Sequence, residues 1–151
     1  MKKILVTIAI ALLSGLILFG TACNSGVNPT VENSISGKVI KGGPIGDKLT
    51  VTLSNDTGKL KNGQQEITLA FTDLSGKAVD VGMVNAAALN FHMPAMGSMS
   101  AMNSAASFTT TDVPGVYKGK VNIQMAGEWQ AQISFEGSAG SAKTMIPVSA
   151  Q

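Results

Sequence analysis

Apolar residues occupy every second position in five segments of the chain, and this alternation restricts its fold more than any other feature. In a β-strand successive side chains point to opposite faces, so one face of each segment can enter a core while the other meets water. No segment after Cys23 shows a clear helical stripe. The alternating positions are Leu49, Val51 and Leu53; Ile67, Leu69 and Phe71; Leu89, Phe91 and Met93; Val121, Ile123 and Met125; and Trp129, Ala131, Ile133 and Phe135.

Turn signals separate these segments. Many short strands with frequent turns are typical of two packed antiparallel sheets. We therefore predict an all-β fold, an immunoglobulin-like antiparallel β-sandwich without the Cys pair of antibody domains. Trp129, the only Trp of the chain, is expected in its core. The turn signals are Asn55-Asp56-Thr57-Gly58, Asn62-Gly63, Ser75-Gly76, Pro114-Gly115 and Ala126-Gly127.

The N-terminus has the layout of a signal peptide. Lys2 and Lys3 precede an apolar stretch over residues 4–19, and Gly20-Thr21-Ala22 leads to the only Cys, Cys23. A spanning helix needs about 20 apolar residues, so this stretch is slightly short for a permanent anchor. The sequence before Cys23 resembles a bacterial lipobox, although Gly20 stands where most lipoboxes have Leu. We predict a signal peptide over residues 1–22 and lipidation of Cys23; an uncleaved anchor with an incidental Cys is the alternative.

The remainder divides into a tether and one domain. Residues 23–36 are rich in Asn, Ser and Gly and are expected to form a lipidated N-terminus with a flexible tether, followed by a domain over residues 37–151. Cleavage would remove Lys2 and Lys3, leaving nine Lys against nine Asp plus Glu, with no Arg. Because nucleic-acid binding relies on basic patches, this balance gives no support for it. The expected location is the cell envelope, facing outward from the cytoplasm in the periplasm or at the cell surface.

The segment from His92 to Met102 is the most informative for function. Met93, Met96, Met99 and Met102 recur at every third residue, and His92 is the only His of the chain. A three-residue step spreads side chains around a helix and reverses faces along a strand. Pro94 and Gly97 also argue against a continuous helix or strand. We therefore predict a surface loop, in which Met residues lack the usual packing explanation.

Soft-metal coordination is one explanation of this loop. Thioether sulfur suits Cu(I), and imidazole suits copper in either oxidation state. The predicted ligands of a copper ion, Cu(I) in particular, are His92, Met96, Met99 and Met102, with Met93 as an additional candidate. The strand phase of Met93 points it toward the core, and Met125 is expected there too. Two alternatives remain: a Met-rich contact surface for a partner protein and plain structural filler.

Several segments also resemble a known family. Met93-Pro94-Ala95-Met96-Gly97, Gly115-Val116-Tyr117, Val121-Asn122-Ile123 and Met125-Ala126-Gly127-Glu128-Trp129 together are similar to the YtkA-like domain. The resemblance runs from about Lys48 to Val148 and implies a YtkA-like β-sandwich over residues 37–151. It also implies an envelope location and a copper role, as in related extracytoplasmic domains linked to copper handling and heavy-metal efflux. With His92 alone, the chain lacks the longer His-and-Met pattern of the periplasmic copper chaperones.

No catalytic constellation is visible in the sequence, and we expect a protein that is not an enzyme. A Ser-His-acid triad would have to use His92, and no Gly-x-Ser-x-Gly elbow or phosphate-binding Gly-rich loop is present. Two functions follow. The first is a membrane-anchored lipoprotein that binds copper for buffering, resistance or delivery, with the membrane and a copper-handling or efflux protein as partners. The second is a structural or interaction module of an envelope complex that uses the Met loop as a contact surface.

Overall fold

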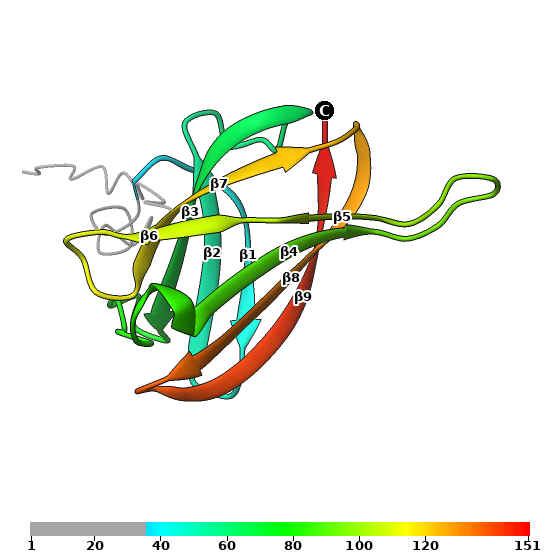
Figure 1. Ribbon diagram of the computed structural model, residues 1–151. Helices are drawn as coiled ribbons and strands as arrows, with labels where there is room; N and C mark the ends of the chain where they lie inside the picture. The colour runs from blue at the N-terminus through cyan, green and yellow to red at the C-terminus, as the bar shows by residue number, and fades with distance from the viewer. Residues whose placement is uncertain (1–35) are drawn as a thin grey trace, which may run out of the picture.

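The computed structural model describes residues 36–151 (Figure 1), and within this range the chain forms nine strands and one short 3-10 helix. The predicted signal peptide, Cys23 and nearly all of the predicted tether lie outside the described residues. The elements are β1 Lys38–Ile45, β2 Leu49–Asn55, β3 Gly63–Asp73, η1 Val84–Ala86, β4 Ala87–Met93, β5 Met102–Ala105, β6 Ser107–Thr110, β7 Val116–Ile123, β8 Gly127–Gly137 and β9 Gly140–Ala150.

The strands form two antiparallel sheets. One sheet has five strands in the order β1-β2-β3-β7-β6, and the other has four in the order β5-β4-β8-β9. The sheets enclose one main hydrophobic core, so the predicted immunoglobulin-like antiparallel β-sandwich is confirmed. Among residues 36–151, no helix is both long enough and apolar enough to cross a bilayer.

The five alternating segments lie in β2, β3, β4, β7 and β8. Strand β4 shows why alternation is informative: Leu89, Phe91 and Met93 are buried, whereas Ala88 is exposed and Asn90 and His92 are half-buried. The pleat therefore divides β4 into a core face and an outer face, as expected for a strand with one face toward a second sheet.

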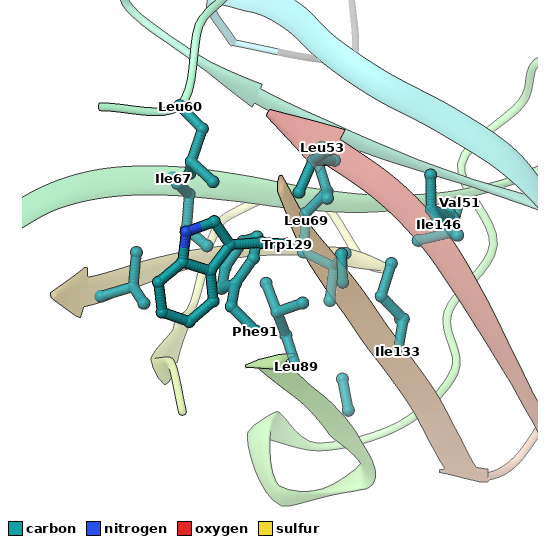
Figure 2. Close-up of a cluster of buried hydrophobic side chains, with 14 of the residues drawn as sticks. Val51, Leu53, Leu60, Ile67, Leu69, Leu89, Phe91, Trp129, Ile133 and Ile146 are labelled. Carbon is teal, nitrogen blue, oxygen red and sulfur yellow. The ribbon is translucent and has the colours of Figure 1, made fainter. Parts of the chain in front are cut away.

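Trp129 lies in the core, as predicted. Its side chain is 1% exposed, and Figure 2 shows it among Leu60, Ile67 and Phe91. The indole Nε1–H donates a hydrogen bond of 3.1 Å to the carbonyl of Met125. A buried Trp needs such a partner because an unpaired polar group in a core is costly. This bond ties the turn between β7 and β8 to the core.

The connection from β4 to β5 leaves the body of the sandwich. In Figure 1 it forms a long, narrow hairpin that extends beyond the two sheets. We call residues 94–101, which join β4 to β5, the hairpin arm. All eight of them are exposed, and they contain the central part of the Met-rich segment.

Candidate metal-binding site

The hairpin arm continues the β4–β5 ladder without a change of register. The ladder ends with the pair Met93↔Met102, and pairing resumes three residues further out at Met96↔Met99. The Met96 amide donates to the Met99 carbonyl at 3.1 Å, and the Met99 amide donates to the Met96 carbonyl at 2.9 Å. Two residues, Gly97 and Ser98, form the turn, where Gly97 adopts a positive φ of 58°. Two-residue hairpin turns favour a residue that tolerates this left-handed conformation.

This register explains the three-residue spacing of the methionines. Because the turn lies between Met96 and Met99, the four side chains form two cross-strand pairs. We call Met96 and Met99 the tip pair, and Met93 and Met102 the base pair. The prediction of a loop extending to Met102 is wrong at its far end, since Met102 opens β5. Met93 closes β4, as its strand phase predicts. A periodicity read along one segment does not show which residues of a second segment pair with it.

The tip pair is exposed. Met96 is 49% and Met99 41% exposed, and neither belongs to the core or to the residues packed against it. Directly opposed residues in an antiparallel pair have Cβ atoms about 4.5–5.5 Å apart. Two flexible thioether side chains at this separation can direct both sulfur atoms at one ion.

The base pair faces the interior. Met93 is 1% exposed, which confirms its predicted orientation toward the core, and half-buried Met102 packs against the same core. Opposed residues of a ladder project to the same face of the sheet. Met102 therefore shares the inner side of β4 and β5 with Met93. Neither lies on the outer face that carries His92.

His92 is held on the outer face by its partner across the ladder, Asn103. Its Nδ1 lies 3.0 Å from Asn103 Oδ1. An amide oxygen can only accept, so Nδ1 is the donor in this contact, and the tautomer with its proton on Nδ1 leaves the Nε2 lone pair for a ligand. Asn103 Oδ1 also accepts from Asn90 Nδ2 at 3.1 Å, and Asn90 Nδ2 donates in addition to Gln132 Oε1 at 3.2 Å. Such second contacts typically orient metal-binding imidazoles.

The predicted ligands consequently occupy three places rather than one. Met96 and Met99 meet at the tip, Met102 meets Met93 on the inner face, and His92 stands on the outer face. Four residues of extended chain, about 13 Å at 3.3 Å per residue, separate His92 from Met96. The structure does not bring the preferred set of His92, Met96, Met99 and Met102 into one coordination shell.

The described residues offer no alternative site of harder donors. Within residues 36–151, no group of three or more His, Cys, Asp and Glu is arranged to hold a metal ion. Groups with a shifted pKa belong to other parts of the fold. The Ser75 hydroxyl, which hydrogen-bonds Asp73, lowers the pKa of that carboxyl, and burial raises the pKa of Tyr117. Sulfur donors therefore dominate the chemistry that the arm can offer.

A groove of about 840 Å³ lies on the outer face of the four-stranded sheet. Its lining residues include Ala88, Asn90, Phe108, Gln132 and Met145. These residues come from distant segments, so no local sequence pattern indicates the groove. Asn103 was missed for the same reason: only its pairing with His92 shows that it orients the imidazole.

Comparison with known proteins gives one match. A family model described as YtkA-like matches residues 46–134, which is more than half of the 151-residue chain and includes the whole hairpin arm. No curated protein gives a significant match, and no solved structure gives one either.

Proposed function

Since the chain belongs to the YtkA-like family, we propose that it is a lipid-anchored protein of the bacterial cell envelope that binds Cu(I) through its hairpin arm. The bound ion is cargo, held for buffering, resistance or delivery to a copper-handling or efflux protein. The proposal is one of binding without catalysis. It places the domain on the outward side of a membrane, with the tether between the lipid and the sandwich.

The exposed tip pair carries this proposal. Met96 and Met99 are directly paired by two backbone hydrogen bonds, yet 49% and 41% of their surfaces face solvent. A core function would require burial, because an apolar side chain contributes about 1.5–3 kcal/mol only when it leaves water. Two neutral sulfur donors suit Cu(I), whereas Mg²⁺ and Ca²⁺ prefer oxygen. The tip pair therefore contributes little to packing, but its two sulfur atoms can coordinate a soft metal ion.

His92 is a separate donor in this proposal. Its Nε2 is free while Nδ1 is held by Asn103, and the ring lies on the outer face of β4. Since about 13 Å of strand separates it from Met96, it would join the tip pair only if the arm folded back over that face. The tip pair alone leaves the ion with two protein ligands, so a partner or a small molecule would supply the rest.

The anchor is proposed from the sequence alone. Residues 1–22 have the layout of a signal peptide, and Cys23 follows the small residues at its end. Ser36 is the first described residue and its carbonyl accepts a hydrogen bond of 3.1 Å from the Ser54 hydroxyl. The described domain thus begins close to the end of the predicted tether.

Competition for Cu(I) tests the metal site. The full chain, purified in detergent under reducing conditions, is titrated against a coloured Cu(I) chelator, and so are two double variants. Met96→Leu with Met99→Leu removes both tip sulfurs and keeps similar volume. Met83→Leu with Met145→Leu is the matched control, because these residues are 77% and 55% exposed outside the arm. We expect the tip variant to withdraw one Cu(I) fewer from the chelator than the full chain, and the control to withdraw as much as the full chain. Equal withdrawal of Cu(I) by all three proteins would refute the tip site.

The same variants separate metal binding from a protein contact surface. Leu keeps the apolar area of Met but removes the sulfur atom. A partner that docks on apolar area would still bind the tip variant, whereas Cu(I) would no longer bind at the tip. If the full chain removes no Cu(I) from the chelator, the interaction module that uses the arm as its contact surface replaces the copper proposal.

A further inference from the structure

A third methionine approaches the base pair where the arm joins the sandwich. Met93 ends β4, Met102 begins β5, and Met125 lies in the short turn between β7 and β8. These positions come from both sheets. Strand β4, which ends at Met93, and strand β7, which is followed by Met125, both end on the side of the molecule from which the arm leaves (Figure 1).

Two hydrogen bonds bring β5 against the end of β7. Gln124 Nε2 donates to the Asn103 carbonyl at 3.1 Å, and the Ser104 hydroxyl donates to the Asn122 carbonyl. Gln124 immediately precedes Met125, and Asn103 immediately follows Met102. The Gln124 side chain therefore links the residue before Met125 to the residue after Met102, across the two sheets.

Met93 reaches the same turn from the other side. Its terminal methyl carbon lies only 3.0 Å from the position that a Cβ atom on Gly127 would occupy. Gly127 is two residues beyond Met125 and adopts a φ of 139°. The thioether end of Met93 consequently fills space that the missing side chain of Gly127 leaves open, beside the turn that carries Met125.

The three side chains differ in their exposure to solvent. Met93 is 1% exposed, while Met102 and Met125 are half-buried, and all three contact the same core. Met often fills irregular gaps, which accounts for Met93. Met102 and Met125 are two further methionines packed against the same core, and their intermediate exposure leaves part of each side chain open to solvent. Such a set suits an ion that accepts soft, uncharged donors.

We infer that Met93, Met102 and Met125 form a second soft-metal site at the base of the arm, distinct from the tip pair. The inference rests on the proposed soft-metal function but uses different sulfur atoms. Three residues of strand, about 10 Å, separate the two places along the arm. The tip site is open on its sides, and the base site is shielded by the sandwich. An ion therefore exchanges quickly at the tip and slowly at the base.

Trp129 reports on the base site alone. It is the only Trp of the chain, and its indole Nε1–H is bonded to the carbonyl of Met125 at 3.1 Å. A heavy ion bound at the Met125 side chain lies close enough to quench its fluorescence. An ion at the tip lies outside the core that encloses the indole. Fluorescence quenching therefore reports the ion at the base site, and the total stoichiometry counts the ions at both sites.

Titration with Ag(I), which shares the closed-shell character of Cu(I) and resists oxidation by air, tests the inference. The full chain in detergent is followed by Trp fluorescence and by native mass spectrometry. We expect two bound ions, of which one quenches Trp129. Met102→Leu with Met125→Leu should bind one ion without quenching, and Met96→Leu with Met99→Leu should bind one ion with quenching. The Met83→Leu and Met145→Leu control should behave as the full chain does.

The two proposals fail in different ways. Quenching that persists in the Met102 and Met125 variant, or that never occurs in the full chain, overturns the base site. Unchanged stoichiometry in the Met96 and Met99 variant overturns the tip site and leaves the base site standing. Near-ultraviolet circular dichroism of Trp129 verifies that each variant is folded. If the double base variant is unfolded, the single Met125→Leu variant, at a half-buried position, gives the same decision.

Discussion

Met93 and Met102 face each other across the last rung of the β4–β5 ladder, on the inner side of the sheet, while the next rung outward joins Met96 to Met99 in solvent. One hairpin thus carries two sulfur pairs in opposite environments. The inner pair is held by the core. The outer pair depends only on the turn that closes the arm.

Gly97→Val should weaken metal binding at the tip without destabilising the sandwich. Gly97 has a φ of 58°, and nothing lies within 4 Å of an added Cβ, so the penalty comes from the backbone conformation alone, about 1–2 kcal/mol. The turn should open and separate Met96 from Met99. Chelator competition should show weaker Cu(I) binding, with an unchanged thermal midpoint. Gly97→Asn is the control, because Asn tolerates this conformation. Equal affinity of the Val and Asn variants would contradict the prediction.

Asn103→Leu should allow His92 to adopt both of its neutral tautomers. Asn103 Oδ1 accepts the Nδ1–H of His92 at 3.0 Å, and without this acceptor the neutral ring loses its preference for Nδ1–H. Nitrogen-15 NMR of the labelled imidazole should show the Nδ1–H form in the full chain and a mixture in the variant. Asn90→Ala, which leaves Asn103 in place, should keep the Nδ1–H form. A mixture of tautomers already present in the full chain would refute the assignment.

Trp129→Ala should cost about 3–5 kcal/mol of stability, as is usual when a buried Trp is truncated. The side chain is 1% exposed, and its loss also removes the hydrogen bond to Met125. Urea denaturation of the full chain measures the change. Glu128→Ala alters the exposed preceding residue and should stay within about 0.5 kcal/mol of the unaltered protein. A loss below 1 kcal/mol at Trp129 would show that the core is not built around it.

Alkaline pH should destabilise the domain through Tyr117. Burial, and then the charge of Asp80, raises the pKa of this phenol, and its hydroxyl donates to the Gly82 carbonyl at 2.6 Å. The unfolded chain therefore releases the proton first. The protonated phenol of Tyr117 contributes its full stabilisation of the fold below the pKa of the unfolded chain, about 10. This stabilisation is lost as pH rises through the pKa of the folded chain. Urea denaturation at pH 8 and pH 10.5 should show a larger loss of free energy of unfolding in the unaltered chain than in Tyr117→Phe. An equal loss in both would place the alkaline effect elsewhere.

Cys23→Ser should abolish lipid attachment. Cys23 is the only Cys of the chain, so it is the only thiol that a lipid transferase can modify. Cells fed radiolabelled palmitate should label the unaltered protein and leave the variant unlabelled and retained at the size of the precursor. Ser25→Ala, two residues further on, should still be labelled. Labelling of the Cys23 variant would contradict the proposed anchor.

Strands with clean alternation could be predicted from the sequence, and strands defined by their neighbours could not. Strand β4, with buried Leu89, Phe91 and Met93, has a pattern that is independent of its surroundings. Strand β1 contains Gly42, Gly43 and Pro44, which weaken any local strand signal, and it forms because β2 offers it a paired edge. The short strands β5 and β6, of four residues each, likewise exist through pairing.

The candidate site divides in the same manner. The types of donor could be predicted, because an excess of methionine around a single His is visible in the residues themselves. Their grouping could not, because it depends on where the chain reverses. Gly97 argues against a continuous helix or strand, but only the pairing of Met96 with Met99 shows which methionines face each other. The placement of β5 against the end of β7 depends on contact between the sheets, which local patterns do not contain.

The unbroken register of the arm limits how its length can change. A residue added on one side of the Gly97–Ser98 turn would shift that side by one position, and a shift of one turns every side chain to the opposite face. Only additions of equal length on both sides of the turn keep the same residues paired across the arm. Relatives with longer or shorter arms should therefore differ from this chain by even numbers of residues, and an odd difference should coincide with a bulge that restores the match.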